Sequence, residues 1–331
     1  MNRGSAMKKL LLLVLSLFIV AAIAGCGGEK TQQGGTDSGK ITLEYTDTLK
    51  KLGFTEPVVL DKKPERVVSL AHTPVLALYE MGIAQVAVPQ NKMFSWPEGL
   101  AENAQQLNVA MNDNFDIESI VALEPDLVII GYHAKDSYGK ILEKENIPVY
   151  YVDAGHVVTY QSVKELTDIL INAFGKDNKG ADAIKERFAK LESRMAEKRS
   201  ANAGKKVMVL QSAPPRHFIQ TDGGTLGSMA ALLGYENVYK NDESRLVLLD
   251  REQALSYDPD LILSVGGSPT AEEHQKLMED DFAKNPEYWQ QFRAIREGKV
   301  LYLPISYVAS SGINVVDQLN ALMDMLEARD L

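Results

Sequence analysis

Cysteine is almost absent from this sequence, since Cys26 is the single one among 331 residues. A chain with one thiol cannot form an intramolecular disulfide framework, and it cannot build a zinc or iron–sulfur site from several cysteines. The stability of the folded protein must therefore come from its apolar cores.

Positive charge is also scarce. The chain has 35 Lys and Arg residues against 45 Asp and Glu, a formal net charge of -10 and a pI near 5.1. This balance argues against non-specific nucleic-acid binding, which needs a basic surface. With 45% hydrophobic and 24% charged residues, the composition is typical of a soluble globular protein of about two domains. It does not fit a collagen-like, disordered or multi-span membrane protein.

Motifs of common enzyme classes are missing as well. The sequence contains no nucleophile elbow, Walker loop, Gly-x-Gly-x-x-Gly or His-Glu-x-x-His pattern. Its histidines are widely spread, with no pair at i, i+4, so we predict no direct metal centre. These absences favour a binding protein over an enzyme that uses a cleft, which stays the less favoured alternative.

Long apolar runs are limited to the N-terminus. Lys8 and Lys9 precede a run from Leu10 to Ala24, which ends in Ile-Ala-Gly-Cys at Cys26. This pattern resembles a bacterial lipobox and predicts a signal peptide over 1–25, cleaved before a lipid-modified Cys26. Stable attachment to a membrane needs two or more acyl chains. The alternative is an uncleaved anchor helix, but the run falls short of the ~20 residues that a membrane span needs.

Strands and helices alternate along the rest of the chain, which favours mainly parallel sheets covered by helices. The expected strands are 66–70, 86–88, 127–130, 149–152, 206–210, 261–265 and 299–303, and the expected helices include 74–81, 138–145 and 225–233. Residues 26–57 are predicted to form a lipidated tether followed by a first strand or hairpin.

An internal repeat divides the chain into two related halves. Residues 116–129 recur as 250–263, each as a helix, a Pro-Asp turn and a strand. We therefore predict an N-terminal lobe at 58–160 and a C-terminal lobe at 204–331, joined by a helical region at 161–203. Within that region Asp177 is expected to cap a long helix that bridges the lobes. Two lobes with one stiff connection predict a ligand cleft between them.

Several motifs together resemble one protein family. They are the lipobox, Pro-Glu-Arg-Val-Val-Ser-Leu at 64–70, the repeated segments at 116–129 and 251–263, the bridging helix, and the stretch 282–300 with Tyr288-Trp289 and Gly298-Lys299-Val300. The set resembles the helical-backbone substrate-binding proteins of ABC importers for iron–siderophore complexes, haem and cobalamin. The likeness covers about residues 58–331.

The resemblance implies two Rossmann-like lobes with a single backbone helix and a ligand cleft between them. It also implies a monomeric, extracytoplasmic receptor, without catalysis or resident cofactor, that hands a metal chelate to a membrane permease. In this family an acidic residue in the first helix of each lobe contacts the permease. Here Leu76 and Ser228 stand at those positions, so Glu80, one turn later, or Glu236 is expected to substitute. The alternatives are a different partner, or a Glu80 that is simply solvated.

Candidate ligand contacts follow the predicted strands and turns at the cleft. They are His72, Trp96, Tyr132, His133, Arg216, His217, Arg245 and Tyr307. Siderophores are often anionic iron chelates with flat edges, and arginine suits them because its guanidinium is planar and permanently charged. Arg216 and Arg245 are therefore the main charged candidates, although Arg245 also fits a surface loop charge.

The choice of chelate depends on a few side chains. Trp96-Pro97 resembles the family's aromatic-Pro turn, where haem binders often carry a ligating tyrosine. Tryptophan offers iron no suitable lone pair, so a ferric siderophore is favoured over haem or a corrinoid. A minority interpretation retains direct ligation of haem iron or a metal by His72, Met111 and His217.

Overall fold

The computed structural model describes residues 39–331 apart from 91–94, 110–114, 155–158, 241–243 and 309–311. Gly39–Leu331 forms one compact unit. The expected signal segment, Cys26 and Met111 lie outside the described residues. Within the described ranges, no helix has both the length and the apolar character needed to cross a membrane.

A five-stranded sheet forms the first half of this unit. Its strands lie in the order β5-β4-β3-β6-β7 and all pair in parallel. They are β3 (Val67–Ser69), β4 (Gln85–Pro89), β5 (Gln105–Leu107), β6 (Leu127–Gly131) and β7 (Val149–Val152). β3, β6 and β7 are buried along their whole length, as parallel strands covered on both faces are. The strands expected from continuous apolar runs are therefore confirmed.

Short helices follow the strands of this sheet. They are α3 (Val75–Glu80), α4 (Glu98–Asn103), α5 (Ile117–Ala122) and α6 (Lys140–Lys144). A 3-10 turn at Tyr132–Ala134 and a π-helical turn at Lys135–Gly139 lead from β6 into α6. Before the sheet, β1 (Ile41–Leu43) and β2 (Val58–Leu60) pair antiparallel, with α2 (Asp47–Lys51) between them.

The second sheet is mixed rather than parallel throughout. Its order is β11-β9-β8-β12-β13, with β10 paired to β8. The strands are β8 (Lys206–Ala213), β9 (Arg216–Gln220), β10 (Glu236–Asn237), β11 (Leu246–Leu248), β12 (Leu261–Gly266) and β13 (Val300–Leu303). β8 runs longer than the predicted 206–210, because it continues as a hairpin into the antiparallel β9.

Helices pack on both faces of the second sheet. They are α9 (Thr225–Leu232), α10 (Arg251–Leu255), α11 (Ala271–Lys284), α12 (Pro286–Trp289) and α13 (Arg293–Arg296), with a 3-10 turn at Ile305–Tyr307. Alternate residues of β8 belong to different cores. Val207 and Val209 join the core that extends through the first sheet, whereas Met208 and Leu210 join a second core with Met278 of α11. This division follows from the period of two along a strand.

The two sheets are linked by α7 (Tyr160–Phe174) and α8 (Lys179–Asn202). The apolar face expected for α8 is buried at Ile184, Phe188 and Leu191. The predicted cap is wrong by one position. Asn178 accepts the Ala181 N–H at 3.1 Å, while Asp177 has a φ of 54° in the turn before the helix.

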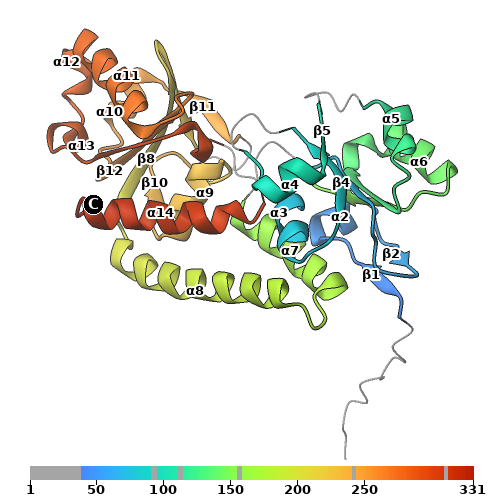
Figure 1. The fold of residues 1–331 in the computed structure, drawn as a ribbon. Helices are drawn as coiled ribbons and strands as arrows, with labels where there is room; N and C mark the ends of the chain where they lie inside the picture. The colour runs from blue at the N-terminus through green and yellow to red at the C-terminus, as the bar shows by residue number, and fades with distance from the viewer. Residues whose placement is uncertain (1–38, 91–94, 110–114, 155–158, 241–243, 309–311) are drawn as a thin grey trace, which may run out of the picture. The chain divides into compact units, whose positions relative to one another are not determined.

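A C-terminal helix adds to the link that α8 makes. α14 (Asn314–Ala328) packs against both α7 and α8, and Figure 1 shows it lying along α8. Arg194 of α8 donates to Asn320 and pairs with Glu327 at 3.1 Å. The single connection expected from the sequence is therefore a helical layer in which α8 is the longest element.

The internal repeat has a structural basis. In the first copy the Asp126 carboxylate accepts the backbone N–H groups of Glu65 and Arg66 at 2.7 and 2.9 Å, just before β3. In the second copy Asp260 accepts the Lys206 N–H at 2.8 Å, where β8 begins. Each Pro-Asp turn thus fixes the start of a neighbouring central strand. The predicted domain boundaries themselves stay predictions.

Candidate ligand-binding site

A cavity of about 580 Å³ brings together residues from four separate segments. Its lining residues are Thr48, Lys51, Leu52, Tyr132, His133, Asp153 and Arg245. We call it the Lys51–Arg245 cavity. Three of the predicted ligand contacts, Tyr132, His133 and Arg245, meet there.

One wall of the cavity stands at the carboxyl ends of parallel strands. β6 ends at Gly131, directly before Tyr132 and His133, and β7 ends at Val152, directly before Asp153. Loops at this edge of a parallel sheet commonly bind ligands. The Tyr132 and His133 rings lie 3.8 Å apart between centroids, at 30° to each other.

The opposite wall carries Arg245, immediately before the edge strand β11. Its carbonyl accepts the Thr221 N–H at 3.1 Å, and the Thr221 hydroxyl donates to the carbonyl of Ser244 at 2.7 Å. These bonds hold the backbone at Arg245 against the end of β9, while its side chain is exposed. The guanidinium is thus carried on an ordered stretch of backbone.

Among the described residues that line the cavity, basic side chains outnumber acidic ones. Lys51 and Arg245 contribute two permanent cations and His133 a third basic group, against the carboxylate of Asp153. The whole chain has a formal net charge of -10. An excess of basic side chains around a cavity favours negatively charged groups electrostatically.

His72 and Trp96 form a pair on the first sheet. The His72 Nε2 lies 3.3 Å from the carbonyl of Gln90, and the Trp96 indole N–H donates to the carbonyl of Pro89 at 2.8 Å. Their ring centroids are 6.0 Å apart, at 26°. Burial lowers the pKa of His72. Neither residue lines the Lys51–Arg245 cavity, so their ligand contacts stay predictions.

Arg216 and Arg245 lie near opposite ends of β9. Arg216 is the first residue of β9. Arg245 precedes β11, which pairs antiparallel with β9, so it lies beside Thr221 just after the other end of β9. Only Arg245 lines the cavity. Both arginines were predicted as ligand contacts because of their charge and planar shape, and for Arg216 that contact stays a prediction.

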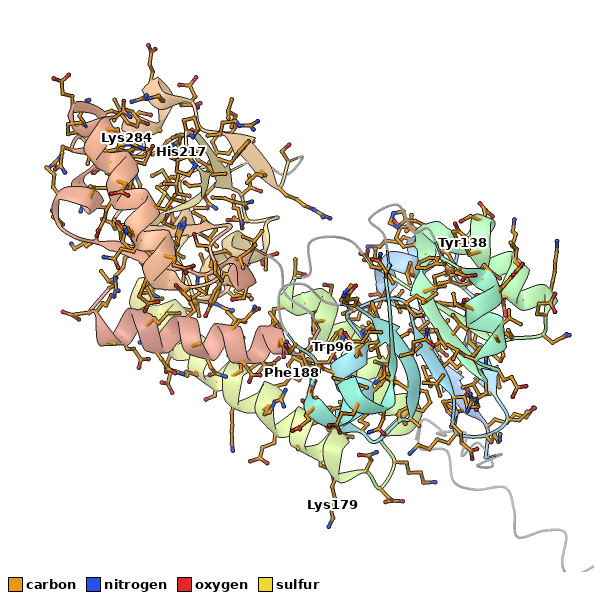
Figure 2. The ribbon with its side chains drawn as sticks, turned by 45° about the horizontal axis from the view of Figure 1, so that its top comes forward. Trp96, Tyr138, Lys179, Phe188, His217 and Lys284 are labelled. Atoms are coloured by element: carbon orange, nitrogen blue, oxygen red, sulfur yellow. The ribbon has the colours of Figure 1, made fainter. Side chains whose placement is uncertain are left out.

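His217 is held within the C-terminal core. Its Nδ1 lies 2.9 Å from the Ser212 hydroxyl, and its Nε2 lies 3.2 Å from a carboxylate oxygen of Asp281. The Trp289 ring packs edge-on at 5.1 Å. Figure 2 shows His217 among the elements of the second sheet and Trp96 among those of the first. His217 does not line the Lys51–Arg245 cavity, so its ligand or metal contact stays a prediction.

Two further predicted contacts have partners inside the protein. Tyr307 is buried, and its hydroxyl donates to the Gln318 carbonyl at 3.0 Å; burial raises its pKa. Arg187 of α8 donates to both carboxylate oxygens of Glu80, at 3.0 and 2.9 Å. Glu80 therefore joins α3 to α8, and its expected contact with a permease stays a prediction.

Four lining residues were not predicted. Asp153 follows the expected strand 149–152, so the strand-end rule that found Tyr132 would also have found it. Thr48, Lys51 and Leu52 come from α2, whose sequence shows no binding motif. Among the described residues, no group of three or more His, Cys, Asp or Glu side chains is placed to hold a metal ion.

The fold and this cavity can now be compared with known proteins. The family model for periplasmic binding proteins matches residues 67–307. The chain belongs to the periplasmic binding protein family. This match spans both sheets and the linking helices, and it begins after α2.

One curated relative is the high-affinity heme uptake system protein IsdE of Staphylococcus aureus, 25% identical over 187 residues. The match covers 56% of this chain and 62% of that relative, so it spans less than two thirds of the relative's length. Its stated ligand is therefore a property of that protein.

Solved structures show the same fold. The petrobactin-binding protein YclQ of Bacillus subtilis has a TM-score of 0.63 at 19% identity, covering 87% of this chain and 99% of that one. The S. aureus IsdE structure complexed with heme has a TM-score of 0.58 at 19% identity, covering 79% and 98%. At these identities the likeness establishes the α/β architecture alone.

Proposed function

We propose that this chain is a lipid-anchored extracytoplasmic receptor that captures a ferric siderophore and delivers it to the permease of an ABC importer. In this proposal the chain binds and releases its ligand without catalysis and holds no resident cofactor. It is proposed to work as a monomer, with the membrane, a small-molecule chelate and the permease as its partners. Membership of the periplasmic binding protein family supports a binding role.

The main supporting observation is Arg245 in the same cavity as Tyr132 and His133. Arg245 comes from the second sheet and the other two from the first, so a ligand that fills the cavity contacts both halves of the fold. A guanidinium beside an aromatic ring suits an anionic chelate with flat aromatic or carboxylate edges.

Haem is the second candidate ligand, because the curated relative is named as a heme uptake protein. Two features weigh against it. His217 packs beside Ser212 and Asp281 in the C-terminal core, and Trp96 donates its indole N–H to Pro89; neither residue lines the cavity. A haem receptor on this scaffold would instead use the exposed His133 at the cavity.

A panel of ligands tests the proposal. The full chain is titrated with a ferric tris-catecholate, a ferric tris-hydroxamate, haemin and cobalamin, following tryptophan fluorescence and the haem Soret band. We expect at least one ferric siderophore to quench fluorescence at sub-micromolar concentration. A sharp Soret shift with haemin and no siderophore binding would establish the second candidate instead. Binding of cobalamin alone, or of nothing in the panel, would contradict the proposal.

Arg245→Ala examines the site itself. Removing one charged hydrogen-bonding partner should weaken an anionic chelate by about tenfold. Arg216→Ala is the matched control, because it removes the same side chain at the far end of β9. We expect it to change affinity by less than about twofold. If Arg245→Ala and the wild type bind the chelate with equal affinity, Arg245 does not contact the ligand.

A further inference from the structure

The segment between β1 and β2 lies outside the matched family region, yet it forms part of the cavity. Family similarity begins at residue 67, whereas α2 occupies Asp47–Lys51. Thr48, Lys51 and Leu52 all line the Lys51–Arg245 cavity. This segment thus adds to the cavity a wall that precedes the matched region.

The start of α2 is firmly held against the first sheet. Thr46 caps the helix, with its hydroxyl 3.4 Å from the Leu49 N–H, and the Asp47 N–H donates to Glu165 of α7 at 2.6 Å. Tyr45 stacks on Tyr150 of β7 at 5.2 Å and 15°. Leu49 is 1% exposed. A helix of this length does not persist alone in water, so these contacts fix its position.

The chain just after α2 is anchored through Phe54, which contacts Tyr132 of the first wall. Phe54 packs against Tyr132 at 6.2 Å and Tyr151 at 5.3 Å, and the Lys135 ammonium lies 4.3 Å from the Phe54 ring centroid. Gly53 has a φ of 93°, which reverses the chain after the helix. Tyr132 therefore contacts both the cavity and the residue that anchors α2.

Between these anchors, α2 presents one cation and one apolar side chain to the cavity. Lys51 is exposed and Leu52 is 53% exposed, although Leu49 and Phe54 beside them are buried. On the other wall, Arg245 lines the cavity, whereas the next residue, Leu246, does not. An apolar side chain that lines a cavity can pack on an apolar part of a ligand, as most ligand pockets are lined by apolar groups.

We propose that the segment 47–54 is a ligand-binding element that selects an anionic chelate with an apolar or aromatic body. Lys51 contacts a negatively charged group of the chelate and Leu52 packs on its apolar part. Lys51 and Arg245 then act on the ligand from separate walls. The inference rests on the proposed function and adds the charge class of the ligand.

Chelate charge provides the test. A ferric tris-catecholate is anionic and has aromatic faces, whereas a ferric tris-hydroxamate is neutral. In the full chain, Lys51→Ala should weaken the catecholate by about tenfold and the hydroxamate by less than about twofold. Leu52→Ala should weaken the catecholate by about fivefold or more through lost apolar contact. Dissociation constants come from fluorescence quenching at fixed ionic strength.

Lys50→Ala is the matched control. Lys50 precedes Lys51 on the same helix, is exposed and does not line the cavity. We expect the wild-type affinity for both chelates. If the wild type binds a chelate but Lys51→Ala and Leu52→Ala behave like Lys50→Ala, the inference is wrong and the proposed function stands. If the wild type binds no chelate of either kind, both proposals fail.

Discussion

His274 shows how one buried side chain links stability to pH. It lies fully buried on α11 with its Nε2 3.0 Å from the Ser264 hydroxyl, and its Nδ1 has no hydrogen-bond partner within the described residues. Burial lowers the pKa of His274 to about 4 from 6.5. The folded protein thus holds this imidazole neutral at pH values where an exposed one is protonated.

The sign of the effect follows from that pKa. Because the folded pKa lies below the unfolded one, the unfolded chain takes up the proton first as pH falls. The free energy of unfolding is therefore largest above pH 6.5 and should fall by about 3 kcal/mol from this residue as pH approaches 4. We expect the free energy of unfolding, measured with urea, to fall between pH 7 and pH 4 in the wild type. In His274→Phe this fall should be smaller by about 3 kcal/mol.

His133→Phe is the control for this measurement. His133 is exposed, so its replacement should leave the pH profile of unfolding like that of the wild type. If the free energy of unfolding depends on pH in the same way in the wild type and in His274→Phe, another group causes the acid sensitivity. His217 is a second group in the same core whose pKa is lowered by burial, so it contributes in the same direction.

At the scale of helices and strands, α3 and α8 are joined by a hydrogen bond, a close backbone approach and an ion pair. The Asn178 amide donates to the carbonyl of Met81 at 2.7 Å, and a Cβ at Gly180 would collide with the backbone carbonyl of Glu80. Arg187 and Glu80 form a partly exposed ion pair, with side chains 35% and 29% exposed. These contacts set the position of the long helix against the first sheet.

The ion pair also tests the expected permease contact. We expect Glu80→Gln and Arg187→Gln each to lower the free energy of unfolding by about 0.5–1 kcal/mol, with the double variant no worse than the sum. If Glu80 only braces α3 against α8, both single variants should transport the chelate equally well in cells. Loss of uptake in Glu80→Gln alone, at normal ligand affinity, would instead show that Glu80 contacts the permease.

Among the secondary-structure elements, the sequence predicted β3, β6, β7, β12 and β13. Strands that are buried on both faces have continuous apolar runs in their sequence. It did not predict β9 and β11. Their residues are only partly buried, so neither an apolar run nor clean alternation marks them. Without this hairpin, the sequence could not show that Arg216 and Arg245 lie near opposite ends of β9.

For the whole molecule, attachment to a membrane depends on one residue outside the described part of the chain. Cys26 is the proposed lipidation site, and two or more acyl chains are needed for stable anchoring. We expect Cys26→Ala to move the protein from the membrane fraction to the soluble or secreted fraction, measured by fractionation and fatty-acid labelling.

Ser16→Ala is the control for this change. It alters the apolar run but keeps the cysteine, so labelling and membrane association should persist. Chelate affinity should be the same in both variants and the wild type, because the cavity is built from residues 48–245. Continued membrane association of Cys26→Ala without label would favour the uncleaved anchor helix.

Sequence alone determined the lack of disulfides, the acidic charge, the repeated helix–turn–strand unit and most central strands. Each is a property of residue counts or of short periodic patterns. Only the tertiary structure decided which side chains share a cavity. Lys51, His133 and Arg245 lie far apart along the chain and meet through sheet order and the packing of α2. The same structure placed Trp96, His217 and Tyr307 among internal partners, because hydrogen bonds to distant backbone and side-chain atoms leave no mark in local sequence.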